Sequence, residues 1–385
     1  MSKLIRITTV SGSLEKLLQG QLKFMSQYFD VVGIASSGEA LHNVNQNEGI
    51  RVIPVEMTRQ ITPIKDIKSV WKLYRIFKKE KPEIVHTHTP KAGTVGMIAA
   101  KLAGVPQRLH TIAGLPLLEA TGFKRRLLNA VERLTYACAT MIYPNSFVLK
   151  QIIINNKFCS IDKLKVIANG SSNGINTSHF DPSLISLAQI DELRISLNIK
   201  KEDFVFLFVG RMVKDKGINE LVSAFKIINN KYQNIKLLLV GIFERELDPL
   251  FNEAEMEIKN NPNIIEAGYQ IDVRPYFAIS DVLAFPSYRE GFPNVVMQAG
   301  AMGLPSIVTD INGCNEIIEN GKNGVIIPPK DKLALIGKLE EILIDDNLRN
   351  KLKDNARKMI TSRYEQSQVW YALLEEYKSI ENQHV

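Results

Sequence analysis

The run Phe204–Val209 (FVFLFV), followed by residues 210–217 (GRMVKDKG), decides the fold of this 385-residue chain. Six consecutive apolar residues form a short block with no in–out alternation, which is typical of a strand covered on both faces. A glycine-containing turn and then a helical pattern follow this block, so the local order is strand, turn, helix. The segment therefore indicates one repeat of an α/β fold.

The same order repeats along the whole chain. It predicts parallel, doubly wound sheets, and two series of runs predict two Rossmann-like domains of an α/β fold. Ligands bind beyond the carboxyl ends of strands in open α/β sheets, so we expect the site in a cleft between two facing domains. The apolar runs expected as strands are residues 4–10, 31–35, 50–55, 83–88, 107–112, 141–144, 164–168, 204–209, 235–240, 263–267, 281–285, 306–309 and 325–327.

Turn-forming residues near 173–199 mark the seam between the domains. We predict an N-terminal Rossmann-like domain over residues 1–175 and a C-terminal Rossmann-like domain over residues 176–365. We expect residues 366–385 to form a C-terminal helix that packs back toward the N-terminal domain.

Composition narrows the class of protein. Hydrophobic residues make up 45% and charged residues 23%, which is ordinary for a globular chain. The three cysteines include no CxxC pair, which argues against a disulfide framework or a zinc site and fits a reducing compartment. The first residues break their apolar run too early for a signal peptide, and no stretch reaches 18 apolar residues. We therefore expect a cytoplasmic protein.

The net charge of +7 is distributed unevenly. Residues 1–180 contain 24 Lys and Arg against 11 Asp and Glu, whereas the remainder carries an excess of 6 negative charges. Lysines and arginines gather at residues 65–81 and at Lys124, Arg125 and Arg126. Apolar residues follow the second cluster at helical spacing, so this stretch could lie on an anionic membrane or equally pack on the core. Few aromatic residues are interleaved with the cations, which disfavours nucleic acid as a partner.

Two loops have the residues of an anion site. Gly210, Arg211 and Lys216 lie between a strand and a helix, where an arginine can bind phosphate through two hydrogen bonds and a lysine acts as a point charge. The second loop, residues 286–294 (PSYREGFPN), follows the strand at 281–285 and precedes another helical pattern. Here Pro293 would preorganise the first helical turn and Asn294 would cap it. A basic surface loop and an ordinary capped helix are the simpler alternatives.

Together these loops resemble the retaining glycosyltransferases of family four, which have the two-domain GT-B fold. The matching motifs are residues 210–217 and residues 290–294 (EGFPN), and the resemblance covers nearly the whole chain. Residues 86–93 and 110–116 are similar to enzymes that extend lipid-linked saccharides in capsule, O-antigen and bacterial N-glycan assembly. Further matching stretches are residues 83–88, 108–111, 169–170, 174–176 and the final helix.

The resemblance implies that the N-terminal domain, residues 1–175, binds the acceptor and that the C-terminal domain, residues 176–365, binds the nucleotide-sugar. It also implies a role for each matching residue. Arg211 and Lys216 would neutralise the donor diphosphate as it leaves, and Glu290 would hold hydroxyls of the donor sugar. His110 would meet the donor sugar or the acceptor. The implied catalytic residues are therefore Glu290, His110, Lys216 and Arg211. The implied donor-binding residues are Gly12, Ser13, Gly210, Arg211, Lys216, Glu290, Gly291, Phe292, Pro293, Asn294 and Gln298.

This sequence departs from the family pattern at three places. Gln298 stands where most relatives have a second glutamate, so a neutral amide would meet the nucleotide ribose and donor affinity would fall modestly. Asn176 stands where relatives often carry aspartate, and residues 11–13 (SGS) replace a glycine pair.

A metal is not expected. His86 and His88 alternate along a strand and point to one face, but no third ligand lies near them in the sequence. No Asp-x-Asp motif is apparent, and basic side chains would take the place of a divalent cation. We expect no cofactor.

The sequence therefore predicts transfer of a sugar, with retention, from a nucleotide-sugar donor to a lipid-linked saccharide acceptor. The enzyme would act at the inner face of the cell membrane as a peripheral protein on an anionic membrane surface, with UDP as the expected nucleotide and a hexose or N-acetylhexosamine as the sugar. Two alternatives stay open: a nucleotide-sugar epimerase or hydrolase of the same fold, and a non-catalytic membrane-associated binding protein. An NAD-dependent dehydrogenase is disfavoured, because the first strand is not followed by Gly-x-Gly-x-x-Gly.

Overall fold

The fold comes from a computed structural model that describes residues 1–58, 60, 62–115, 117, 120–246 and 248–382. The chain divides into two compact units. The first contains residues 1–174 and 366–385, and the second contains residues 175–365. Pro116 of the 110–116 motif and residues 383–385 of the expected C-terminal helix lie outside the described residues.

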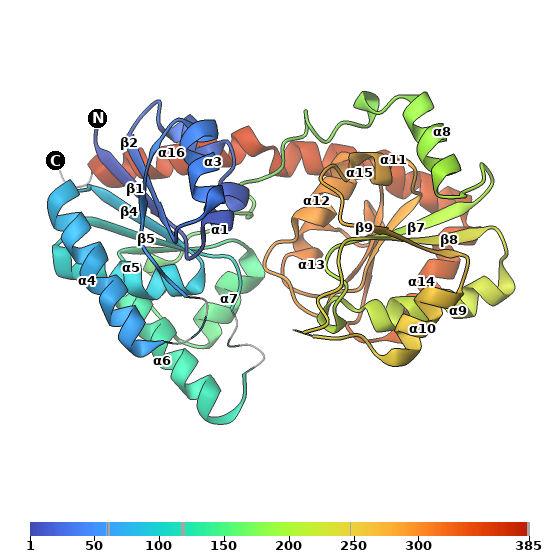
Figure 1. The fold of residues 1–385 in the computed structure, drawn as a ribbon, viewed down its shortest axis with the longest axis horizontal. Helices are drawn as coiled ribbons and strands as arrows, with labels where there is room; N and C mark the ends of the chain where they lie inside the picture. The colour runs from blue at the N-terminus through green and yellow to red at the C-terminus, as the bar shows by residue number, and fades with distance from the viewer. Residues whose placement is uncertain (59, 61, 116, 118–119, 247, 383–385) are drawn as a thin grey trace. The chain divides into compact units, whose positions relative to one another are not determined.

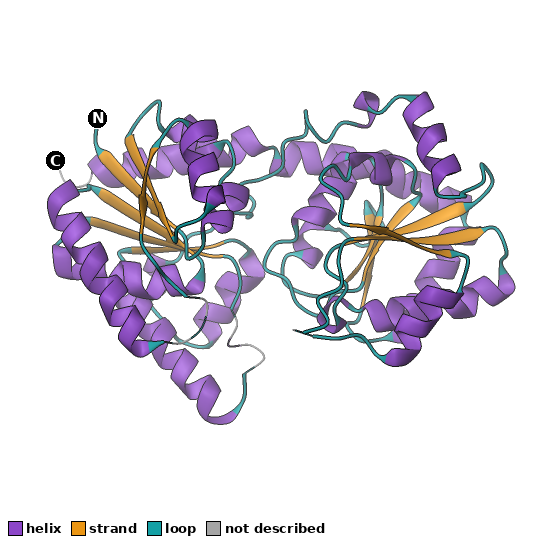
Figure 2. Ribbon diagram, viewed as in Figure 1, coloured by secondary structure: helices purple, strands orange, loops and turns teal. Residues whose placement is uncertain are grey.

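The first unit is built on a six-stranded parallel sheet in the order β3-β2-β1-β4-β5-β6. Figures 1 and 2 show this sheet with helices packed around it. Helices cover both faces of this sheet because its strands are apolar on both sides. The strands are β1 (Lys3–Ile7), β2 (Asp30–Ala35), β3 (Arg51–Pro54), β4 (Ile84–His88), β5 (Gln107–Ile112) and β6 (Met141–Pro144). The helices are α1 (Ser11–Leu17), α2 (Gln21–Met25), α3 (Glu39–Glu48), α4 (Pro63–Glu80), α5 (Pro90–Ala103), α6 (Gly122–Cys138), α7 (Phe147–Asn155) and α16 (Gln366–Asn382).

The second unit repeats this architecture with the strand order β12-β11-β10-β7-β8-β9. Its core is a single cluster, and the largely buried strands β10 and β7 lie at the centre of the sheet. The strands are β7 (Phe204–Val209), β8 (Ile235–Val240), β9 (Ile264–Gly268), β10 (Val282–Phe285), β11 (Ser306–Thr309) and β12 (Gly324–Ile327). The helices are α8 (Leu187–Ser196), α9 (Ile218–Lys231), α10 (Asn252–Asn260), α11 (Arg274–Ala278), α12 (Asn294–Ala301), α13 (Cys314–Ile317), α14 (Lys332–Ile344) and α15 (Asp346–Tyr364).

The expected doubly wound α/β class is confirmed, and one predicted strand is wrong. Residues 164–168 make a single bridge, between Leu164 and Ile142, and then leave the sheet. The reason is the backbone at Ala168, whose φ of 48° lies in the left-handed region and turns the chain away. The seam region also contains α8, whose N-terminus has a capping box between Ser186 and Gln189, where only turns were expected.

The last helix, α16, belongs to the first unit by its contacts. Its residues Leu373, Leu374 and Tyr377 are buried in the same cluster as β1, β4 and β5. At its start, Trp370 Nε1 donates to Asn173 Oδ1 at 2.6 Å. Gln21 Nε2 donates to the same oxygen at 3.0 Å, so one asparagine side chain joins α2, α16 and the end of the 1–174 segment.

Candidate active site

Two loops meet in the second unit because their strands are neighbours. The loop after β7 and the loop after β10 leave the carboxyl ends of adjacent strands, where the strand order reverses. This is the point at which open α/β sheets bind ligands. Gly217, with φ of 72°, sits so close to the second loop that a Cβ there would lie 2.1 Å from the Pro286 carbonyl oxygen. The close approach therefore requires glycine at this position.

Lys216 and Glu290 form an ion pair across these two loops. Their side chains are only 15% and 14% exposed, so the pair is largely shielded from water. Ser287 donates a second hydrogen bond to the same Glu290 oxygen at 2.8 Å, and the Lys216 ammonium lies 5.7 Å from the centre of the Phe285 ring. The two residues that sequence analysis placed on separate loops thus act on each other directly.

Backbone and side-chain bonds hold the Glu290 loop in place. The Tyr288 amide donates to the Asp215 carbonyl oxygen at 2.8 Å, and Arg289 pairs with the Asp215 carboxylate at 2.8 Å. From the loop after β11, Asn312 Nδ2 donates to the Gly291 carbonyl oxygen at 2.6 Å. The supporting roles of Asp215, Ser287 and Asn312 were not predicted from the sequence. The sequence shows only that Ser287 and Asn312 follow strands closely, which does not identify their bonding partners.

The other predicted donor-binding residues of this unit do not form one cluster with Lys216 and Glu290. Arg211 shares the first loop with Gly210, but its guanidinium is half exposed and pairs with Glu244 at 2.7 Å instead of approaching Glu290. Phe292 is buried against Tyr364, with ring centres 5.4 Å apart, so it packs in the core. Gln298 lies half-buried on α12.

The expected cap of α12 is wrong. The helix starts at Asn294, whose side chain is exposed, and Pro293 occupies the N-cap position with no side-chain cap bond. Pro293 has ψ of 109°, an extended conformation, so the helix begins one residue earlier than it would if Asn294 were the capping residue.

The first unit has its own switch point between β1 and β4. Thr9 Oγ1 and Thr89 Oγ1 are 2.7 Å apart there, and the Ala92 amide donates to Thr9 Oγ1 at 3.2 Å. Thr89 has φ of 72°, which is unusual for a β-branched residue and costs free energy. Gly12 and Ser13 lie in the first turn of α1, and a Cβ on Gly12 would meet no atom within 4 Å.

His110 is buried in the structure. Its imidazole is 3% exposed and its Nδ1 lies 2.9 Å from Thr87 Oγ1. A Cβ on Gly93 of α5 would lie 2.3 Å from this ring, so the glycine makes room for it. Burial lowers the pKa of His110 from 6.5 to about 4, and the ring is therefore neutral near pH 7.

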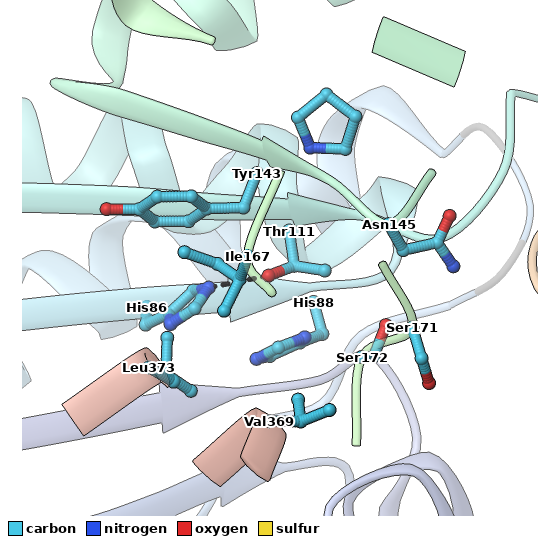
Figure 3. Close-up of a pocket in the computed structure, with 11 residues that line it drawn as sticks. His86, His88, Thr111, Tyr143, Asn145, Ile167, Ser171, Ser172, Val369 and Leu373 are labelled. Carbon is cyan, nitrogen blue, oxygen red and sulfur yellow. Dashed lines mark hydrogen bonds between the residues drawn. The ribbon is translucent and has the colours of Figure 1, made fainter. Parts of the chain in front are cut away.

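His86 and His88 lie on the opposite face of the sheet from His110, since neighbouring residues of a strand point to opposite sides. Their rings stack with centres 4.5 Å apart, as their alternation in the sequence predicts (Figure 3). His86 is bonded to Tyr377 of α16 at 2.5 Å and to Thr111 at 2.7 Å. Both histidines line a cavity of about 20 Å³, roughly the space of one water molecule. This cavity is too small for a sugar or a nucleotide.

No group of three His, Cys, Asp or Glu side chains in the described part of the chain is arranged to hold a metal. The basic cluster predicted to face acceptor and membrane lies on α6. Lys124 and Arg126 are exposed there, whereas Arg125 turns inward and donates to the Leu117 carbonyl oxygen at 2.7 Å. Over the residues described, no helix combines the length and apolarity that a membrane crossing needs.

Comparison with known proteins gives the class. Residues 189–359 match the family described as glycosyl transferases group 1, and residues 17–146 match the family described as glycosyl transferase 4-like. A crystal structure of HepE from Anabaena in complex with UDP superimposes with a TM-score of 0.81 at 19% identity, covering 98% of this chain and 100% of that one. The fold is therefore that of the GT-B glycosyltransferases.

Relatives at higher identity define the family. The capsular polysaccharide biosynthesis glycosyltransferase CapM of Staphylococcus aureus is 36% identical over 381 residues, 98% of this chain and 97% of the relative. A UDP-Gal:alpha-D-GlcNAc-diphosphoundecaprenol alpha-1,3-galactosyltransferase of Escherichia coli is 33% identical over 315 residues, 80% of this chain and 78% of the relative. The chain belongs to the group 1 glycosyltransferases.

Proposed function

We propose that this glycosyltransferase moves a hexose or N-acetylhexosamine from a UDP-sugar to a polyprenyl-diphosphate-linked saccharide, with retention of the anomeric configuration, in the assembly of a surface polysaccharide. The observation that carries the proposal is the meeting of Lys216 and Glu290 at the switch point of the second unit. A cation and a carboxylate held side by side suit a donor that has a diphosphate next to a sugar.

The relatives support the choice of donor and acceptor. The name of the Escherichia coli relative gives a UDP-sugar, a diphosphoundecaprenol acceptor and an alpha linkage. The Staphylococcus aureus relative is named for capsular polysaccharide biosynthesis. For this chain we infer the same class of donor and acceptor.

In the proposed mechanism the Lys216 ammonium moves its bond from Glu290 to a diphosphate oxygen and stabilises the charge that grows there as the sugar leaves. Glu290 then accepts hydrogen bonds from sugar hydroxyls, while Ser287 and the Asn312-bound backbone keep its carboxylate in position. Arg211 reaches the diphosphate by exchanging its exposed bond to Glu244. We expect the acceptor hydroxyl to give its proton to the departing diphosphate oxygen, on the same face of the sugar.

In this proposal His110 is neutral, and its unprotonated ring nitrogen accepts a hydrogen bond from a hydroxyl of the donor sugar or of the acceptor. Because its Nδ1 is bonded to Thr87, the second ring nitrogen is the one available. We expect no divalent cation or cofactor, because Lys216 and Arg211 supply the positive charge. Activity should therefore persist in EDTA.

The enzyme would work at the inner face of the cell membrane as a peripheral protein. A lipid-linked acceptor stays in the bilayer, so a chain that uses it must reach an anionic surface. The excess of positive charge in residues 1–180, including Lys124 and Arg126 on α6, favours such a surface.

The test is transfer of radiolabelled sugar from UDP-sugars to a polyprenyl-diphosphate saccharide. Lys216→Ala and Glu290→Ala should each lower kcat by about 100-fold or more, since each removes a charge aimed at the reacting groups. Lys214→Ala is the matched control, because the Lys214 ammonium lies over the Phe251 ring, 4.8 Å from its centre, and is not the cation paired with Glu290.

Near wild-type transfer by both variants would defeat the assignment of the site. Inversion of the anomeric centre, read by NMR of the product, would defeat retention. Turnover of donor with no acceptor present would instead indicate an epimerase or hydrolase.

A further inference from the structure

The outward side of α4 exposes a stripe of large apolar residues. Ile64, Ile67 and Trp71 are 74%, 69% and 61% exposed and lie at i, i+3 and i+7, so they share one side of the helix. The opposite side packs on the core through the buried residues Leu73 and Phe77. Because the core covers only one side of α4, the apolar stripe on the other side is a surface that a binding partner could cover.

Cations border this stripe. The Trp71 and Ile76 side chains line a surface hollow together with Lys72, Arg75 and Lys79. Trp71 stacks on Tyr74 with ring centres 5.4 Å apart, which gives the stripe an aromatic continuation. The exposed basic residues of the helix are Lys65, Lys68, Lys72, Arg75, Lys78 and Lys79.

The two acidic residues of α4 do not offset this charge. Asp66 pairs with Lys91 of α5 at 2.5 Å. Glu80 pairs with Arg51 at 2.5 Å and with Lys3 at 2.8 Å. Both carboxylates are thus neutralised by cations from other elements, and the six basic residues of the helix remain as net positive charge.

The neighbouring helix α6 makes a weaker surface of the same kind. Both helices pack against α5, on one face of the first sheet (Figure 1). On α6, Phe123 is 81% exposed, but the Arg125 guanidinium bonds to Leu117, Asn129 and Asn156. The cluster that the sequence singled out on α6 thus presents fewer free cations than α4.

We propose that the outward side of α4, comprising Ile64, Ile67, Trp71 and the exposed basic residues around them, docks on an anionic phospholipid bilayer. The apolar stripe enters the boundary between headgroups and acyl chains, where tryptophan is favoured, and the cations lie against lipid phosphates. The inference deepens the proposed function, which supplies the reason for an enzyme to hold a bilayer.

Binding to vesicles tests the proposal without donor or acceptor. We expect the full chain to sediment with vesicles of phosphatidylglycerol and phosphatidylcholine, and to bind pure phosphatidylcholine at least tenfold more weakly. Combining Ile64→Ser, Ile67→Ser and Trp71→Ser should weaken binding to the anionic vesicles at least tenfold. Each of Lys68→Gln and Arg75→Gln should weaken it about fivefold, and binding should fall as salt is raised.

Tryptophan fluorescence identifies the element that inserts. Trp71 should shift to shorter wavelength on anionic vesicles, and Trp71→Phe should lose the shift while it still sediments. Phe123→Ser on α6 is the matched control, because it replaces an equally exposed apolar residue, and binding should change less than twofold. All the replaced side chains are exposed, so the unfolding midpoints should be those of the wild type.

Anionic vesicles that bind the triple α4 variant as well as the wild type would overturn the proposal. So would a tenfold loss in Phe123→Ser, which would move the docking surface to α6. The proposed function fails separately, if the wild type binds vesicles but does not transfer sugar to a water-soluble, short-chain acceptor.

Discussion

Three buried histidines link the stability of the first unit to pH. Burial lowers the pKa of His110 to about 4 and lowers the pKa of His86 and His88 as well. Below pH 6.5 the unfolded chain binds protons at these rings while the folded chain does not, so the free energy of unfolding falls as the pH drops. For His110 alone we expect a loss of about 2 kcal/mol between pH 7.5 and pH 5, measured by urea unfolding.

The variant His110→Gln separates this contribution from the others. It has no titrating ring at this position, so its stability should change less between the two pH values than that of the wild type. His42→Gln, which replaces an exposed imidazole on α3, should keep the wild-type dependence. Equal pH dependence in His110→Gln and the wild type would contradict the prediction.

At the same scale, the sequence predicts charged partners better than it predicts their supports. Lys216 and Glu290 could be singled out from sequence as donor-site residues, because each follows a strand and carries a charge that suits one end of a nucleotide-sugar. Asn312 could not, since its hydrogen bond to the Gly291 carbonyl oxygen depends on β10 and β11 becoming neighbours in the sheet. The inward turn of Arg125 likewise depends on the carbonyl oxygen of Leu117, which no local pattern places beside it.

At the scale of single helices and strands, an apolar pattern is enough to predict some elements and not others. Largely buried strands such as β7 and β8 are recognisable because both of their sides are mostly apolar. Residues 164–168 share that composition but leave the sheet at Ala168, where the backbone is left-handed. An alanine gives no sequence signal for this conformation. Helix α8 could not be predicted from the apolar pattern, because none of its residues is buried and its sequence has no apolar periodicity.

Helix α16 is tied to the first sheet by a polar contact that can be tested alone. Tyr377 is fully buried, and its hydroxyl is 2.5 Å from His86 Nδ1. Tyr377→Phe leaves that nitrogen without its partner, so we expect the free energy of unfolding to fall by about 1 to 3 kcal/mol. Tyr371→Phe on the same helix is the control: this ring is 54% exposed, and urea unfolding should show no measurable change. Equal stabilities for the two variants would argue against the bond.

At the scale of the whole molecule, the two units have separate cores. Sequence indicated the division because two series of strand patterns flank a stretch of turns, and the observed boundary falls between Gly174 and Ile175, one residue from the expected position. The return of α16 to the first unit depends on its buried contacts with β1, β4 and β5, which are visible only in three dimensions.

Each unit contains a buried cysteine that can report its own unfolding. Cys138 of α6 is 6% exposed and Cys314 of α13 is fully buried, and both are free thiols. A ligand that binds only the folded second unit raises the unfolding free energy of that unit, by about 2.7 kcal/mol at 100 times its dissociation constant. We therefore expect UDP to slow the labelling of Cys314 in partial urea denaturation, read by mass spectrometry of peptides, and to leave Cys138 unchanged. GDP at the same concentration should protect Cys314 less, and Lys216→Ala should abolish the difference between the nucleotides. Protection of Cys138 alone would place the nucleotide in the first unit and contradict the assignment of Lys216, whereas equal protection of both thiols would show that the units unfold together.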